Sequence, residues 1–152
     1  SCYYFLMPLI QNKKVYFDYE ILQKLEAGIE LLGFEVKSLK KGQGALAGSR
    51  VSVRGNEAFV VNMNIPPYQP KNTPKDYDAE RPRRLLLSKK EIVELSKIES
   101  QKGLTIVPLS VYNKGRKLKL EIAVVRGKKK YDKRESIKKR NTDREIRRSL
   151  KE

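Results

Sequence analysis

The chain has 152 residues, of which 39% are apolar, and this composition suits one domain of ordinary size with a hydrophobic core. Its 34 Lys and Arg outnumber its 18 Asp and Glu, and the formal net charge of +16 indicates a polyanionic partner. Histidine is absent and Cys2 is the single cysteine, which excludes a Ser–His–Asp triad, a histidine general base, every His-containing zinc site and an internal disulfide.

From these absences we expect no enzyme activity, no metal site and no cofactor. A single cysteine suits the reducing cytoplasm, which is the expected location. The apolar run 2–10 has nine residues, too few to span a membrane, so no membrane-spanning segment is expected.

The first half of the chain contains signals for strands and one helix. Residues 1–9 are interpreted as an N-terminal extension. Residues 14–21 are rich in Val, Tyr, Phe and Ile, which is typical of a strand. A helix is expected within 29–40, where apolar side chains recur at helical spacing. Residues 50–62 are predicted to form a β-hairpin, since Gly55 stands first in a two-residue loop and suits a type II′ turn.

A long loop and a well-marked helix follow. Residues 66–82 hold five of the seven prolines, and a loop of this length in a small domain is usually functional or disordered. Ser88 and Glu91 form a capping-box signature, and an apolar stripe runs from there towards Gly103. These signals predict a helix that begins after Ser88.

The last part of the domain is predicted to be a hairpin of two long strands, 104–112 and 117–125, joined by a turn at 113–115. In the second strand the alternation directs one set of side chains to the core and the other to solvent. The core set is Leu118, Leu120, Ile122 and Val124, and the solvent set is Lys117, Lys119 and Glu121.

These elements together predict a mainly β fold with flanking helices. Five or six short strands, two helices and long loops are typical of an OB-fold-like antiparallel β-barrel, which we assign to residues 10–125. Residues 126–152 carry 13 basic and 5 acidic side chains and few apolar ones. This composition predicts a basic C-terminal tail that is disordered when free.

Acidic and glycine clusters give weak signals for chemistry. Glu26, Glu30 and Glu35 lie close together in sequence, but no apolar pocket or ordered spacing supports acid–base or metal work. We interpret them as solvated acids that offset nearby bases. The glycine-containing segment 42–48 lacks the Lys-Ser/Thr of a phosphate-binding loop and is interpreted as a flexible connection.

Clustered basic residues give the strongest signal. Arg81, Arg83 and Arg84 flank the Pro-rich loop, and further lysines open the tail around Tyr131, whose ring could stack on a base. Phosphate contacts add affinity without sequence specificity. Composition alone therefore leaves RNA, DNA and an anionic membrane open as partners.

Several segments, in order along the chain, resemble a known family. They are Asn12-Lys13-Lys14, Glu26-Ala27-Gly28-Ile29, Glu35-Val36-Lys37-Ser38-Leu39, Asn56-Glu57-Ala58-Phe59, Arg84-Leu85-Leu86-Leu87, Glu91-Ile92, Lys102-Gly103-Leu104-Thr105, Gly127-Lys128-Lys129 and Asp132-Lys133-Arg134. The ordered set is similar to the SmpB family, the SsrA-binding proteins that bind transfer-messenger RNA.

The resemblance implies an RNA-binding adaptor of trans-translation, not an enzyme. Such a protein binds the tRNA-like domain of transfer-messenger RNA and delivers it to stalled ribosomes for rescue and nascent-chain tagging. The implied partners are this RNA and the ribosome, where the tail would fold in the vacant mRNA channel near the decoding centre of the small subunit. We expect a monomer when it is free. The alternative is a general structured-RNA-binding protein or RNA chaperone, and a metal-dependent nuclease is a distant third.

The resemblance also implies site residues. Glu26 matches an acid important for RNA binding, and Leu86 matches a position implicated in the same contact, although core packing is an equally weighted role for this leucine. Weaker matches to the RNA face are Asn12, Tyr19, Arg83 and Arg84. The matching tail residues, with an implied ribosomal role, are Lys128, Lys129, Tyr131, Asp132, Lys133 and Arg134.

Overall fold

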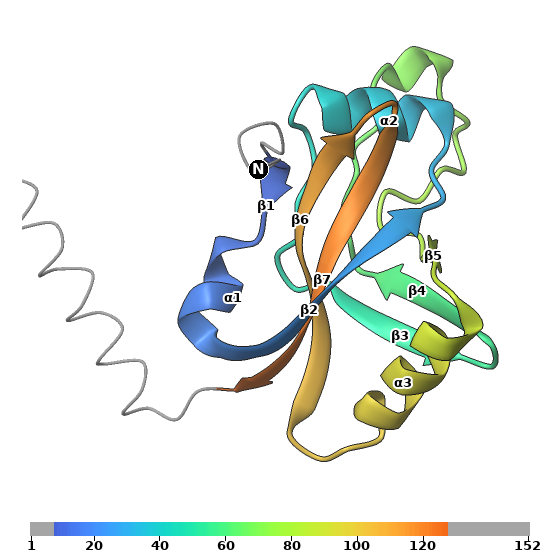
Figure 1. Cartoon of the computed structure of the whole chain (residues 1–152). Coiled ribbons are helices and arrows are strands. Elements are labelled where there is room, and N and C mark those ends of the chain that lie inside the picture. The colour runs from blue at the N-terminus through green and yellow to red at the C-terminus, as the bar shows by residue number, and fades with distance from the viewer. Residues whose placement is uncertain (1–7, 128–152) are drawn as a thin grey trace, which may run out of the picture.

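The computed structural model describes residues 8–127, which form one antiparallel sheet of seven strands with three α-helices around it (Figure 1). The strand order is β1-β6-β7-β2-β5-β4-β3. The elements are β1 (Pro8–Gln11), α1 (Lys13–Asp18), β2 (Tyr19–Ile29), α2 (Gly33–Lys40), β3 (Arg50–Arg54), β4 (Glu57–Val61), the 3-10 turn η2 (Pro70–Asn72), β5 (Arg83–Leu86), α3 (Lys89–Glu99), β6 (Leu104–Lys114) and β7 (Lys117–Gly127).

The sheet is strongly curved around the main core. Figure 1 shows the β3–β4 hairpin beside the long strands, on the same side as α3, and β3 contacts both β6 and α3. Within residues 8–127 no hydrogen-bonded ladder joins β3 to β6, so the barrel is partly open. The prediction of a mainly β, OB-fold-like architecture with flanking helices is confirmed.

The main core lies on the inner face of the sheet. Leu118, Leu120, Ile122 and Val124 of β7 all point into it, as their alternation predicts. Helix α3 closes one side with Ile92 and Leu95. Its capping box is confirmed, since the Ser88 hydroxyl accepts from the backbone N–H of Glu91 and the Glu91 carboxylate accepts from the backbone N–H of Ser88.

A second, smaller core cluster lies on the outer face of β6 and β7, and it explains one wrong prediction. Of the predicted strand 14–21, only 19–21 are extended, as the start of β2, because 13–18 are helical as α1. Val15 of this helix packs against Val107, Leu109, Ala123 and Val125. Burying Val15 over this patch outweighs the strand preference of Val, Tyr and Phe, since tertiary packing commonly overrides propensity.

Strand β2 begins only at Tyr19, and no strand was predicted for its residues 22–29. Its pairing with β7 contains a bulge between Ile21 and Gln23, which breaks the two-residue alternation. Strand β5 was also missed, as four residues are too few for a clear pattern. The sheet extends from Pro8 to Gly127, two residues beyond each end of the predicted domain.

The two predicted hairpins are present, one with a shifted turn. Gly55 has φ 62° and Asn56 does not have a positive φ, as a type II′ turn requires. In the second hairpin Lys114 pairs with Lys117, so the turn is Gly115-Arg116 and not 113–115. Gly115 has φ 65°, a conformation that favours glycine at this position. The predicted helix within 29–40 is confirmed as α2.

Candidate nucleic-acid interface

The uncovered part of the outer face of β2, β5, β6 and β7 brings together residues from distant parts of the chain. We call this surface the open face and define it by Glu26, Arg84, Leu86, Tyr112, Lys114, Lys117, Lys119 and Glu121. Its register is fixed by the strand ladders: Glu26 pairs with Glu121, Lys119 pairs with Tyr112, and Gly28 pairs with both Lys119 and Leu86. Paired residues project to the same side of a sheet, so Glu26 and Leu86 are neighbours on this face.

Glu26 is held by two side chains of β6. The Tyr112 hydroxyl donates to Glu26 Oε2, and Lys114 Nζ donates to Glu26 Oε1 at 3.0 Å. The hydrogen bond from Tyr112, followed by the positive charge of Lys114, holds the pKa of Glu26 below its usual range. Burial and the neighbouring carboxylate of Glu26 raise the pKa of the Tyr112 hydroxyl. Glu26 is therefore an ionised acceptor in a fixed orientation, which differs from the expected solvated acid.

Leu86 is 50% exposed, which contradicts the core-packing role that the sequence allowed for it. The burial pattern of β5 alternates, so Arg83 and Leu85 point inward while Arg84 and Leu86 point outward. Leu86 borders a cleft of about 250 Å³ whose apolar part is Gly28, Ile29, Leu31, Val36 and Leu118. Basic side chains rim the cleft, namely Arg116, Lys117 and Lys119.

Arg84 lies on the open face, and its guanidinium forms ion pairs across the sheet. Its Nη1 is 3.3 Å from Glu30 Oε1 and its Nε is 3.5 Å from Glu57 Oε1. All three side chains are about half exposed. Exposed ion pairs of this kind are weak, so Arg84 can exchange its partners for a phosphate.

Arg83 does not lie on any surface, which corrects its predicted place on the RNA face. The side chain is 0% exposed, and its guanidinium donates to Glu35 and to the backbone oxygens of Met63, Arg81 and Ala79. The guanidinium therefore donates its hydrogen bonds to acceptors within the protein itself. The sequence shows that Arg83 is basic, but it does not show that a buried carboxylate neutralises the charge.

Glu35 is the partner that neutralises Arg83, and it too is 0% exposed, so it is not a solvated acid. It accepts from Arg81, Arg83, Tyr77 and the backbone N–H of Leu32. Burial alone raises the pKa of Glu35, but the hydrogen bonds from Arg81, Leu32 and Arg83 outweigh burial and lower it.

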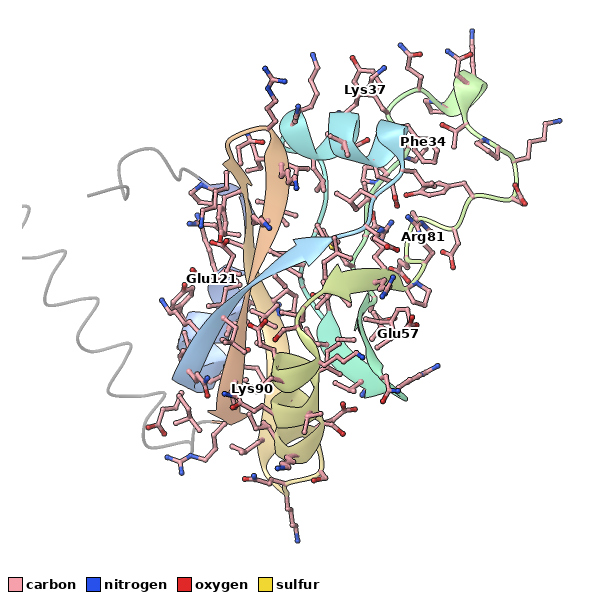
Figure 2. All side chains as sticks on the ribbon, turned by 45° about the vertical axis from the view of Figure 1, so that its right-hand side comes forward. Phe34, Lys37, Glu57, Arg81, Lys90 and Glu121 are labelled. Atoms are coloured by element: carbon pink, nitrogen blue, oxygen red, sulfur yellow. The ribbon has the colours of Figure 1, made fainter. Side chains whose placement is uncertain are left out.

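The Glu35 cluster ties the Pro-rich loop to α2. Tyr77 packs edge-to-face on Phe34 at a ring-centroid distance of 4.7 Å. Burial, followed by the Glu35 carboxylate, raises the pKa of Tyr77 to about 12. Figure 2 shows Phe34 and Arg81 on the loop side of the view, with Glu121 of the open face on the other side. The loop is therefore an ordered part of the fold.

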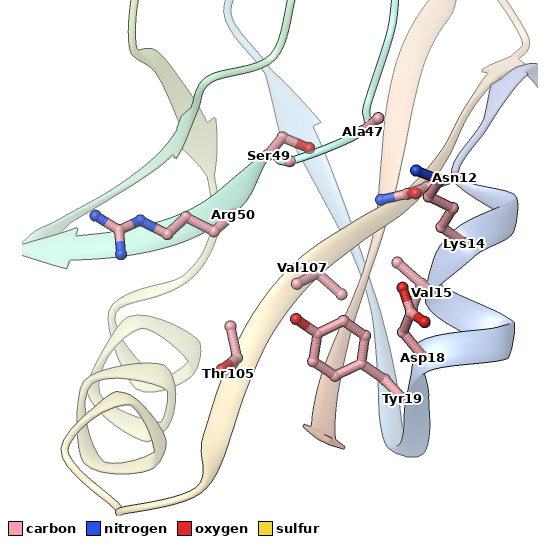
Figure 3. A pocket seen from close by; sticks show the side chains of 11 residues that line it. Asn12, Lys14, Val15, Asp18, Tyr19, Ala47, Ser49, Arg50, Thr105 and Val107 are labelled. Carbon is pink, nitrogen blue, oxygen red and sulfur yellow. The ribbon is translucent and has the colours of Figure 1, made fainter. Parts of the chain in front are cut away.

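Asn12 and Tyr19 line a separate cleft of about 310 Å³ between α1, the segment before β3 and β6 (Figure 3). Asn12 is only 6% exposed, and its amide donates to the backbone oxygens of Leu46 and Pro108, both at 3.2 Å. Its side chain joins three segments of the fold and is not directed to solvent. Tyr19 is half-buried and borders the cleft together with Lys14 and Arg50.

The structure thus divides the predicted residues. Glu26, Arg84 and Leu86 meet on the open face, Asn12 and Tyr19 lie at the second cleft, and Arg83 is internal. Sequence reasoning missed Tyr112 and Lys114 as partners of Glu26, although it placed Lys119 and Glu121 on the solvent side of their strand. Only the strand register brings these residues to Glu26, and a single sequence does not reveal that register.

The predicted tail residues Lys128, Lys129, Tyr131, Asp132, Lys133 and Arg134 lie outside the described residues. Over residues 8–127, no group of three or more His, Cys, Asp and Glu side chains is placed to hold a metal ion. None of the helices in that range is long and apolar enough to cross a membrane.

Comparison with known proteins places these observations in a family. A family model described as SmpB protein matches residues 9–152. An SsrA-binding protein of Thermosipho africanus is 51% identical over 141 residues, which are 92% of this chain and 94% of that protein. One from Sulfurihydrogenibium sp. is 50% identical over 140 residues, 92% of this chain and 91% of the relative.

A solved structure gives the same result. The chain matches a structure described as "tmRNA-SmpB: a journey to the center of the bacterial ribosome" with a TM-score of 0.68 and 39% identity. The match covers 86% of this chain and 95% of the solved one. At this level of identity both the sequence and the fold are related.

Proposed function

This chain belongs to the SmpB family, and from that premise we propose that it is an RNA-binding adaptor of trans-translation. In this role it binds the tRNA-like domain of transfer-messenger RNA and brings that RNA to stalled ribosomes. The tail acts on the ribosome, and the protein is a cytoplasmic monomer that performs no chemistry of its own.

The observation that carries the proposal is the composition of the open face. Leu86 offers an exposed apolar contact, Lys117 and Lys119 offer charges for phosphates, and Glu26 offers an ionised acceptor. A surface that bound any polyanion would gain nothing from a fixed carboxylate, since a carboxylate repels phosphates. A carboxylate does accept from the amino and imino groups of bases. The open face therefore suits an RNA that presents base edges beside its backbone.

The proposal assigns a second role to the C-terminal segment. Residues 128–152 supply 12 basic side chains against 5 acidic ones, which suits a path along ribosomal RNA. Residues Lys128, Lys129, Tyr131, Asp132, Lys133 and Arg134 open this segment. Cutting the chain after Gly127, the last residue of β7, should leave transfer-messenger-RNA affinity nearly unchanged and abolish nascent-chain tagging.

The first test measures RNA affinity with the full chain. The tRNA-like fragment of transfer-messenger RNA is compared with a tRNA of the same size at about 50 and about 200 mM salt, a range over which phosphate contacts weaken strongly. A preference for the tRNA-like fragment that persists at the higher salt supports the proposal. The variant Leu86→Ala should reduce that preference, whereas Val93→Ala, a change at an exposed apolar residue of α3, should not.

Equal binding of both RNAs, with both affinities falling together as salt rises, would instead identify a general structured-RNA-binding protein or RNA chaperone. Tagging that survives removal of the tail would contradict the role given to that segment. Cleavage of either RNA on incubation with Mg²⁺ or Mn²⁺ would contradict the absence of enzyme activity.

A further inference from the structure

We propose that Tyr112 is a positioning residue for RNA recognition, because its hydroxyl holds the Glu26 carboxylate in one orientation on the open face. This inference rests on the proposed function and assigns a role to a residue that does not itself contact the RNA bases. Tyr112 is only 6% exposed, so it acts through Glu26 and not as a contact of its own.

The placement of the two side chains supports this role. Tyr112 lies near the end of β6 and Glu26 lies in β2, with β7 between them. Lys119 of β7 is the cross-strand partner of Tyr112, so the tyrosine side chain reaches across β7 to Glu26. The tyrosine ring stands on a rigid three-stranded ladder, and the hydroxyl at its end fixes the carboxylate. The orientation of Glu26 is therefore set by the sheet itself.

The two partners of Glu26 differ in what binding RNA can do to them. Tyr112 is anchored and buried, and its hydroxyl has the Glu26 carboxylate as its partner. Lys114 is 57% exposed, and its ammonium can leave Oε1 for a nearby phosphate. When Lys114 moves to the backbone of the RNA, Oε1 becomes free to accept from a base while Tyr112 still holds Oε2. The Glu26 carboxylate thereby links two events, the binding of a phosphate by Lys114 and the recognition of a base edge by Oε1.

The surroundings of Glu26 show why the hydroxyl matters. The charged and titratable groups that face this carboxylate are Lys24 on its own strand, Tyr112 and Lys114 on β6, and Lys119 and Glu121 on β7. Without the hydroxyl, the surrounding ammonium groups can pull the carboxylate aside. Glu121, which is paired with Lys24 at 4.0 Å, is a carboxylate acceptor and cannot replace Tyr112 as a hydrogen-bond donor to Glu26. The tyrosine is the one neutral donor in this group.

The test is a double-mutant cycle of Tyr112→Phe and Glu26→Gln in the full chain, with affinity for the tRNA-like fragment as the readout. Phenylalanine keeps the buried ring and removes only the hydroxyl. We expect Tyr112→Phe to weaken binding about tenfold when Glu26 is present and less than about twofold in the Glu26→Gln background, the size of one lost charge-assisted hydrogen bond. Tyr68→Phe is the matched control, since its ring also remains, and it should not change affinity.

A pH series adds a readout that a merely structural role would not change. The wild-type carboxyl stays ionised to lower pH because Tyr112 donates to it. As the pH is lowered, the affinity of Tyr112→Phe for the tRNA-like fragment should therefore begin to fall at a higher pH than the affinity of the wild type. The affinity of Glu26→Gln should not show this fall, because glutamine has no carboxyl group to protonate. Thermal unfolding of each variant reports whether the fold is kept.

The outcomes separate the two proposals. If the wild type does not prefer the tRNA-like fragment, the proposed function fails and the positioning role fails with it. If the wild type does prefer it but Tyr112→Phe binds equally well, only the positioning role is overturned. Equal losses from Tyr112→Phe in both backgrounds would also overturn it, because the tyrosine would then act independently of Glu26.

Discussion

Glu35 and Arg83 form an ion pair in which both side chains are completely buried, with Arg83 Nη2 2.6 Å from Glu35 Oε2. One residue comes from α2 and the other begins β5. The pair also binds Tyr77 and Arg81, so the end of the Pro-rich loop is attached to the helix. Two adjacent arginines, Arg83 and Arg84, thus have opposite roles, one inside the fold and one on the open face.

This difference predicts unequal effects of removing each arginine. Arg83→Met should destabilise the fold by about 3–5 kcal/mol, because a buried carboxylate loses a partner. Arg84→Met removes exposed ion pairs and should cost about 1 kcal/mol or less. Urea unfolding of the two variants and the wild type measures both costs. Similar costs for the two variants would contradict the internal role of Arg83.

Glu35 also predicts a pH dependence of stability. Its pKa in the folded protein lies below its ordinary value of 4.5, so its contribution is present above that value and is lost as pH falls through the lower folded pKa. The difference in unfolding free energy between the wild type and Glu35→Gln should therefore shrink below about pH 4.5. Both proteins retain Glu26, so the difference isolates Glu35. A difference that stays constant down to the acid transition would contradict this assignment.

Two glycines should respond in opposite directions to alanine. A Cβ on Gly28 would lie 3.0 Å from Leu86 Cβ, so Gly28→Ala displaces Leu86 and should cost about 1 kcal/mol or more. Gly33 begins α2 and has nothing within 4 Å of such a Cβ. Gly33→Ala should therefore stabilise the fold by about 0.4–1 kcal/mol, since it restricts the unfolded chain. Thermal or urea unfolding tests both, and destabilisation by Gly33→Ala would contradict the geometry.

The sequence allowed several elements to be predicted because their signals are local. Ser88 and Glu91 mark the start of α3 without help from distant residues, and Gly55 specifies its turn through its own φ. The alternation in β7 predicted its core side in the same way. The family resemblance added Glu26 and Leu86, which the structure places side by side.

Other features could not be predicted because they depend on tertiary pairing. Helix α1 forms where the local sequence favours a strand, since Val15 covers a patch built by β6 and β7. Charge counting assigned Arg83 to the surface, but a partner 48 residues away neutralises it. The tyrosine that holds Glu26 is 86 residues distant in sequence, and only the strand order brings it there.

A final prediction compares a lysine on the open face with a lysine elsewhere on the protein surface. Lys119 lies between Glu26 and the cleft beside Leu86, whereas Lys97 lies on α3, away from this face. If Lys119 contacts a phosphate, Lys119→Ala should weaken binding of the tRNA-like fragment and reduce the slope of log affinity against log salt by about one. Lys97→Ala removes the same charge and should change neither quantity measurably. Titrations of both variants at four or more salt concentrations, about 50 to 200 mM, provide the two slopes. Equal changes for the two lysines would mean that RNA affinity depends only on the net charge of the protein. That result would contradict the assignment of the open face as the binding surface.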